Sequence, residues 1–346
     1  MTDQHQHQHK LGECGRLSPA ETRRLLSRRG FLAATGGVAG AFALGGTAAA
    51  APAQATTPPP IGKLGGSRLR LHILSDVHIS DVYPMTMNDM RTMLQDLHSV
   101  FPDPDAMVII GDLTEFGQVQ DYPLNHLALQ TSPHPDRVLL AIGNHEYMSN
   151  TSPVAPTHES VEELQKRFLD YVGRDSLYYT DHVGGYPFII LGGESAGPNP
   201  PIVLEPQLDW LESQLEEYAR PGRPTFVFLH QPPEITNNPA RFTTLLKSYP
   251  NVILFWGHYH VDLSWHLRGP DPTLLGNNEG YWRIQCPATT YCWYYDSTSG
   301  KFTQTFMADW KQALAVEVFD HGVRVRGRDG YTNSWINGFD QVIPIV

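Results

Sequence analysis

Short apolar runs alternate along this chain with longer segments of helical spacing. Five runs are rich in Val, Ile, Leu or Phe and have the length of strands buried in a parallel sheet. They cover residues 69–74, 106–110, 138–142, 225–229 and 252–256. Three longer segments repeat apolar residues at intervals of three and four, which predicts helices over residues 85–100, 159–172 and 205–218. This alternation of strands and helices predicts βαβ units and an α/β fold.

Other apolar segments predict strands outside those units. Residues 177–182 and 186–191 flank Gly184-Gly185, which predicts a hairpin. After Gly280 the pattern turns to strands, and these are expected over residues 281–285, 302–306, 314–319 and 323–327. They require no separate domain.

Nearly every one of the five apolar runs ends at a short polar motif. In chain order the motifs are Asp76-Val77-His78, Gly111-Asp112, Gly143-Asn144-His145-Glu146, His230 and Gly257-His258-Tyr259-His260. Open α/β sheets bind ligands outside the carboxyl ends of their strands, so the motifs are expected at the place of chemistry. Asp, His and Asn without Cys favour metals such as Mn, Fe or Zn over an iron–sulfur cluster. One histidine at a strand end is usually only a surface residue, but the five motifs together predict a metal site.

These motifs resemble, in order and in strand context, the pattern of the calcineurin-like metallophosphoesterase superfamily, which is D-x-H, GD, GNH-[DE], H and GHxH. The resemblance runs from about Arg68 to about Pro287. It implies a four-layer α/β/β/α sandwich in which the strands after Gly280 belong to the second sheet. It also implies a phosphoester hydrolase that holds two divalent or mixed-valence metal ions.

The resemblance assigns ligands residue by residue. Metal one would be held by Asp76, His78, Asp112 and His260, and metal two by Asp112, Asn144, His230 and His258. Two dications about 3.5–4 Å apart repel unless anions lie between them, which explains why the Asp112 carboxylate would bridge. A hydroxide between the metals would then attack phosphorus in line.

Two further residues of the third motif receive roles from the same resemblance. His145 is similar to the family histidine that faces the substrate, where it would stabilise the phosphate or protonate the leaving oxygen. Glu146 would orient His145 or a metal ligand. His72 lies within the first apolar run, before the Asp76 turn, and is expected to be a core or lining histidine.

Departures from subfamily patterns narrow the substrate class. Purple acid phosphatases carry a Tyr three residues after the bridging Asp, whereas Glu115 stands there in this chain, so a tyrosinate-bound ferric ion is not expected. Serine/threonine protein phosphatases carry an Arg that clamps phosphate, and Phe116 stands at that position. The remaining resemblance is to the cyclic-nucleotide and glycerophosphodiester phosphodiesterases, although these commonly have Asp where Glu146 stands and His where Gln231 stands. A phosphomonoesterase and a non-catalytic metal-binding module of the same fold remain alternatives.

The beginning of the chain carries a separate signal. Ser27-Arg28-Arg29-Gly30-Phe31-Leu32 resembles a bacterial twin-arginine export signal, and an uncharged Gly/Ala-rich stretch leads from it to Ala53-Gln54-Ala55, a small-residue cleavage site. This predicts a leader over residues 1–55, a Pro- and Gly-rich segment over residues 56–67 and a metallophosphoesterase domain over residues 68–346. After removal of the leader, the mature protein is expected to be periplasmic or extracellular. The twin-arginine export machinery is expected to be a partner. An uncleaved membrane anchor is the disfavoured alternative, because Gly dilutes the stretch.

The charge of the chain bears on its partners. The 346 residues include 25 Lys and Arg and 36 Asp and Glu, for a formal net charge of −11. Six of the basic and three of the acidic residues lie in residues 1–55, so the remainder carries −14. Such a surface repels duplex nucleic acid and anionic lipid, and neither a nucleic acid duplex nor stable membrane binding is expected. A small phosphoester can still enter, because the metals dominate the local field.

Two features near the last motif keep more than one interpretation. Six aromatic residues gather there: Tyr281, Trp282, Tyr291, Trp293, Tyr294 and Tyr295. Most of them are expected to fill space between the sheets, and the alternative is a pocket for the base or alcohol group of a substrate. Cys286 and Cys292 could form a disulfide in an exported protein. An extended path of about 20 Å between them would forbid that bond and a turn at Pro287 would permit it.

Overall fold

The computed structural model describes residues 64–152, 155, 157–195, 203–264, 275–276, 280–296 and 303–346. The predicted leader and its cleavage site lie outside these residues. Within the described ranges, no helix is both long enough and apolar enough to cross a membrane.

The first sheet joins strands from the two ends of the described chain. Its order is β14-β13-β12-β1-β2-β3. The strands are β1 (Ser67–Leu74), β2 (Ala106–Ile110), β3 (Val138–Ala141), β12 (Gln312–Phe319), β13 (Gly322–Asp329) and β14 (Ser334–Pro344). β1, β2 and β3 are parallel, and β12 pairs antiparallel with the free side of β1. The carboxyl ends of three consecutive parallel strands therefore lie along one edge.

The second sheet has the order β4-β5-β6-β7-β9-β8. Its strands are β4 (Tyr179–Val183), β5 (Tyr186–Ile190), β6 (Thr225–Phe228), β7 (Val252–Trp256), β8 (Leu275–Gly276) and β9 (Trp282–Gln285). The predicted hairpin is confirmed as β4 and β5, and β5, β6, β7 and β9 run parallel. A separate antiparallel pair is formed by β10 (Cys292–Asp296) and β11 (Thr303–Met307).

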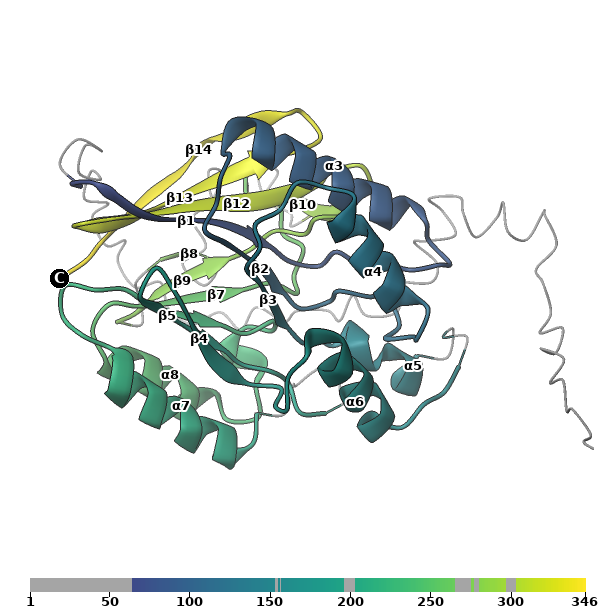
Figure 1. Cartoon of the computed structure of the whole chain (residues 1–346), viewed down its shortest axis with the longest axis horizontal. Coiled ribbons are helices and arrows are strands. Elements are labelled where there is room, and N and C mark those ends of the chain that lie inside the picture. Colours follow the sequence, from purple (N-terminus) through teal and green to yellow (C-terminus); the bar gives the residue numbers. More distant parts are fainter. Residues whose placement is uncertain are drawn as a thin grey trace, which may run out of the picture. The chain divides into compact units, whose positions relative to one another are not determined.

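Helices cover the outer face of each sheet, as Figure 1 shows. The first sheet carries α3 (Met85–Val100), α4 (Asp121–Gln130) and α6 (Val161–Val172), and the second carries α7 (Glu205–Tyr218) and α8 (Pro239–Ser248). Shorter turns of helix are η2 (His145–Tyr147), α5 (Met148–Thr151) and η3 (Pro233–Ile235). This arrangement confirms the predicted α/β/β/α sandwich.

The core between the sheets explains why the strands read as continuous apolar runs. In β2, Val108 and Ile110 belong to the cluster shared with β5, β6 and β7, whereas Met107 and Ile109 pack with the helices α3 and α6. Because both faces of such a strand are covered, neither set of alternating positions can be polar. In β2, the first polar residue therefore appears after the strand ends.

The strands after Gly280 are distributed differently from the prediction. β9 joins the second sheet, but β12, β13 and β14 extend the first sheet beyond β1. The register pairs Leu71 with Val316 and Ile73 with Leu314. Apolar patterning shows that a strand is buried but does not show which open sheet edge it will pair with, so the expected assignment of these strands to the second sheet was wrong.

Candidate metal centre

The five polar motifs follow β1, β2, β3, β6 and β7, and their side chains converge at the carboxyl edge of the two sheets. Among the described residues, three sets each place ligand atoms within 4.8 Å of one another, and two of these sets contain Asp112. Group one is Asp76, His78, Asp112 and His260, and group two contains Asp112, His230 and His258. Asp112 belongs to both groups, which is the arrangement that a shared carboxylate requires.

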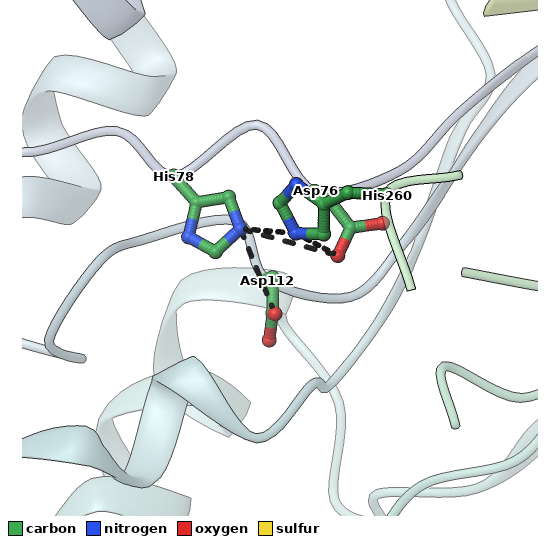
Figure 2. Close-up of side chains that lie close together, drawn as sticks. All are labelled: Asp76, His78, Asp112 and His260. Carbon is green, nitrogen blue, oxygen red and sulfur yellow. Dashed lines mark hydrogen bonds and ion pairs between the residues drawn. The ribbon is translucent and has the colours of Figure 1, made fainter. Parts of the chain in front are cut away.

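Group one is compact and buried (Figure 2). Nε2 of His78 lies 3.1 Å from Nε2 of His260, and Oδ1 of Asp76 lies 3.0 Å from Nε2 of His260. Oδ2 of Asp112 is 3.8 Å from Nε2 of His78. Two imidazole nitrogens and two carboxylates thus face a common point.

The outer nitrogens of these imidazoles indicate what the inner ones offer. Nδ1 of His260 donates to the carbonyl of Tyr291 at 3.1 Å, and Nδ1 of His78 lies 2.9 Å from Oε2 of Glu115. In both rings Nδ1 faces an oxygen of the protein, which leaves Nε2 directed toward the other ligand atoms. Oδ1 of Asp76 is buried and accepts no hydrogen bond from the described residues. Because imidazole nitrogens and carboxylates converge at this point, this residue set fits a divalent cation.

Group two adds an amide oxygen to the two remaining histidines. Nε2 of His230 lies 3.0 Å from Oδ2 of Asp112 and 3.1 Å from Oδ1 of Asn144. Nδ1 of His258 lies 2.9 Å from the same Asn144 oxygen. Nδ1 of His230 donates to the carbonyl of Ile110 at 2.6 Å, which turns Nε2 toward the centre. We therefore include Asn144 in group two, and the structure brings all seven predicted metal ligands together.

The protonation states of the centre reflect its negative field. Burial opposes a charge on His230, but the Asp112 and Asp76 carboxylates attract positive charge and raise its pKa to about 9. Burial and the neighbouring His230 lower the pKa of His258 to about 3, so this ring stays neutral, as a ligand must. The two Asp carboxyls have pKa values below their usual range, because the attraction of nearby histidines outweighs their burial. A cation bound here would displace the His230 proton.

His145 lies beside the two groups. Its backbone amide donates to Oδ1 of Asp112 at 2.8 Å, and its Nδ1 donates to the carbonyl of Glu115 at 3.0 Å. Its Nε2 is 4.0 Å from Oδ2 of Asp112. The His145 side chain is 12% exposed, whereas that of His78 is fully buried. His145 is therefore more exposed than the buried ligand His78.

Glu146 holds the backbone of the centre. Its carboxylate accepts the amides of Asp112 at 3.1 Å, Thr114 at 2.9 Å and Gly143 at 2.7 Å. Burial and the nearby Asp112 charge raise the pKa of Glu146 to about 7. Of the two roles expected for Glu146, these contacts match the orientation of a ligand, and they act through the Asp112 backbone.

The ligand loops are strained and closely packed. Eight described non-glycine residues have positive φ, and five of them are predicted ligands: Asp76, His78, Asp112, His258 and His260. Such conformations persist only where the surroundings enforce them, and they gather at functional sites. Gly111 has φ of 73°, and a Cβ there would lie 2.7 Å from the His230 ring. A Cβ on Gly143 would collide with the Asp112 carboxylate.

Two residues of the centre were not predicted as site residues. The Tyr291 ring stacks on the His260 ring at 4.2 Å between centroids, and its carbonyl anchors His260. Glu115 contacts both His78 and His145. The position of Glu115, three residues after Asp112, was a usable signal, but nothing in the local sequence separates Tyr291 from the aromatic residues around it.

Three other residues have the following outcomes. His72 is buried and its Nε2 lies 3.0 Å from the carbonyl of Phe101, which confirms a core role. Cys286 and Cys292 are both free, buried thiols, so the disulfide alternative is wrong. Their Sγ atoms instead lie 3.7 Å from the carbonyls of Ile73 and Ala288 respectively.

Parts of this chain are similar in sequence to known proteins. The family model described as calcineurin-like phosphoesterase matches residues 69–262. The glycerophosphodiester phosphodiesterase GpdQ of Enterobacter lignolyticus is 24% identical over 209 residues, which cover 53% of this chain and 69% of that protein. A probable cyclic nucleotide phosphodiesterase of Rhodococcus erythropolis is 25% identical over 45% of this chain and 52% of that protein.

The fold also resembles a solved structure. The purple acid phosphatase PPD1 of yellow lupin superposes with a TM-score of 0.54 at 14% identity, over 80% of this chain and 53% of that one. The match to the family model spans more than half of this chain and contains all the predicted metal ligands. This protein therefore belongs to the calcineurin-like phosphoesterase family and is a metallophosphoesterase, an enzyme that hydrolyses phosphoesters.

Proposed function

We propose that this enzyme is a dinuclear phosphodiesterase that acts on small phosphodiesters of the glycerophosphodiester or cyclic-nucleotide type. The observation that carries the proposal is the convergence of group one and group two on the shared Asp112 carboxylate. Similarity to GpdQ and to a probable cyclic nucleotide phosphodiesterase supports the diester class.

The residues divide between metal binding and substrate binding. We assign group one to metal one and group two, with Asn144, to metal two, and the donor set suits Mn, Fe or Zn. When bound, two such ions supply an activated water at neutral pH and neutralise the phosphoryl oxygens. His145 lies outside both ligand sets, and we assign it to the substrate phosphate or the leaving oxygen.

One feature of the site favours diesters over monoesters. Phe116 occupies the position at which protein phosphatases carry the phosphate-clamping Arg, and its side chain is buried against Tyr83. A monoester dianion carries one more charge than a diester, and the bidentate guanidinium contact that would balance it is missing from that position. The diester needs less cationic support.

The test is a comparison of bis-p-nitrophenyl phosphate with p-nitrophenyl phosphate after chelation and reloading with Mn, Fe, Zn or Co. We expect two metals per chain and faster hydrolysis of the diester. Faster hydrolysis of the monoester would establish the phosphomonoesterase alternative. A metal content well below two, together with no hydrolysis of either ester, would establish the non-catalytic metal-binding module.

We also propose that residues 1–55 form a twin-arginine leader that is removed near Thr56, so that the mature domain acts outside the cytoplasmic membrane. Arg28-Arg29 and the Ala53-Gln54-Ala55 site support this. Replacing both arginines by Lys keeps the charge, and we expect the precursor to remain in the cytoplasm with its metals bound. Unchanged secretion of the Lys pair, or a mature N-terminus upstream of Arg28, would contradict the proposal.

A further inference from the structure

Glu115 is a buried carboxylate that the proposed metal ligands do not include. It lies in the segment after β2, and its side chain is 1% exposed. The backbone of this segment runs beside the segment after β1: the amide of Ile79 donates to the carbonyl of Leu113, and the amide of Glu115 donates to the carbonyl of Ile79. These hydrogen bonds place the Glu115 side chain against the His78 ring.

Glu115 contacts two imidazoles through different atoms. Its Oε2 lies 2.9 Å from Nδ1 of His78, and its backbone carbonyl accepts from Nδ1 of His145 at 3.0 Å. Its Oε1 lies 3.7 Å from Nδ1 of His145. The two rings stand perpendicular, with centroids 4.4 Å apart. One residue therefore faces the outer nitrogen of both rings.

We propose that Glu115 is the positioning residue of the centre: its carboxylate orients His78 for metal one and its carbonyl orients His145 for the substrate. The inference rests on the proposed dinuclear function. A carboxylate at the outer nitrogen of a ligating imidazole fixes the ring and raises the basicity of the inner nitrogen. Such partners typically change metal affinity about 10–100-fold.

A cation between Glu115, His78 and His145 is a competing interpretation, because these three residues also place ligand atoms within 4.8 Å of one another. Nε2 of His78 already faces Asp76 and Asp112. A third cation would require both nitrogens of His78 to bind metal, and therefore the loss of the ring's remaining proton. The Glu115 carboxylate instead lies 2.9 Å from Nδ1 of His78, while Nε2 of the same ring faces Asp76 and Asp112, so the geometry favours positioning.

The side chain and the carbonyl of Glu115 can be separated by mutation. Glu115→Ala removes the carboxylate but leaves the carbonyl that anchors His145. Glu115→Gln keeps the volume and an oxygen that can face Nδ1 of His78, but it removes the charge. We therefore expect metal one to bind about 10–100-fold more weakly in Glu115→Ala and to recover in part in Glu115→Gln. Binding of metal two should change by no more than about twofold.

The measurement is equilibrium dialysis with metal analysis, combined with the visible spectrum of bound Co²⁺ and thermal melting of each metal-free variant. Asp121→Asn is the matched control, because Asp121 is also a buried carboxylate near this loop but accepts the amide of Asp81 instead. The control should keep both metals and the Co²⁺ spectrum. If Glu115→Ala does not fold, the same measurements are made on Glu115→Gln. This variant should bind metal one more weakly than the parent protein does.

The outcomes distinguish this inference from the proposed function. An unchanged affinity for metal one and an unchanged Co²⁺ spectrum in the folded variants would overturn the positioning role. Equal loss of both metals with a collapsed melting temperature would overturn it too, because Glu115 would then support only the fold. A third metal that disappears in Glu115→Ala would establish the cation site instead. A parent protein that binds fewer than two metals would refute the dinuclear proposal itself.

Discussion

Group one and group two, the two halves of the centre, differ in their exposure to solvent. Every residue of group one is buried, and both of its imidazoles have an outer contact within the protein, at Glu115 and at the Tyr291 carbonyl. Group two includes His258, which is partly exposed, and lies beside the partly exposed His145. Group one is therefore enclosed by the protein, whereas group two lies on the more exposed side of the centre, and we expect a substrate to approach from that side.

The two groups also differ in charge. Group one contains two carboxylates, Asp76 and Asp112, whereas group two contains Asp112 and the neutral amide of Asn144. A divalent cation is attracted more strongly by two anions than by one, so metal one should bind more tightly than metal two. The predictions below test this division, beginning with the residue that both groups share.

Asp112→Asn should prevent metal binding by both groups, so that group one no longer differs from group two. The shared carboxylate disappears, and the amide that replaces it cannot supply the negative charge between two cations. We expect the loss of both metals and a fall in turnover on the order of 10⁴-fold or more, with the fold retained. Metal analysis, kinetics and circular dichroism check this, and near-normal metal content and rate would defeat the assignment.

His145→Ala should affect only the substrate side. Because His145 lies outside both ligand sets, we expect both metals to remain while turnover falls by about 10²–10⁴, the usual range for an acid–base group. The loss should be smaller for esters with good leaving groups, which need less protonation. If the variant instead loses a metal, the roles of His145 and its neighbour Asn144 have been exchanged.

His258→Ala should separate the groups. Removal of this partly exposed ligand should weaken metal two by about 10–100-fold and leave one tightly bound metal per chain. Excess metal should restore much of the activity. His260→Ala is the comparison variant, and in it the tight ion should be the one that is lost. The same stoichiometry in both variants would show that the two groups do not act as separate sites.

Asp121→Asn tests a buried carboxylate that has no converging histidines. Burial raises the pKa of Asp121 to about 7, and its Oδ2 has no hydrogen-bond partner among the described residues. The folded state therefore favours the protonated form of Asp121. The contribution of Asp121 to the stability of the fold is complete below pH 3.8, the ordinary pKa of an Asp, and is lost as pH rises through about 7. Asn mimics the protonated form. The variant should be more stable than the parent by about 1–3 kcal/mol at pH 8 in urea unfolding, and the gain should vanish near pH 4.

Local chemistry explains how much the sequence could predict. A strand buried on both faces is mostly apolar, so the polar motif after it marks both its end and the place of a ligand. This is why β2 and β7 were predicted with the bounds that the structure shows, and why the seven predicted ligands lie together. The order of the five motifs predicted a metal site, which no single residue could predict.

Other features depend on contacts that the local sequence does not contain. The helix α4 begins at Asp121 without a side-chain cap on Gln120, and only part of it is apolar, so it was not predicted. Its stability comes from packing against α3 and the first sheet. The pairing of β12 with β1 and the stacking of Tyr291 on His260 join residues that are distant in the chain. Neither leaves a periodic pattern.

The pairing of β1 has a consequence for the order in which this molecule can be completed during synthesis. One side of β1 receives β2 early, but the other side waits for β12, because Leu71 pairs with Val316. Until the ribosome has delivered that distant strand, β1 exposes an unpaired edge, and such edges invite association with other chains. Closing so long a loop is also slow. The strand that leads into Asp76 and His78 is thus among the first to be made and among the last to be enclosed, so a nascent chain should need protection for most of its elongation.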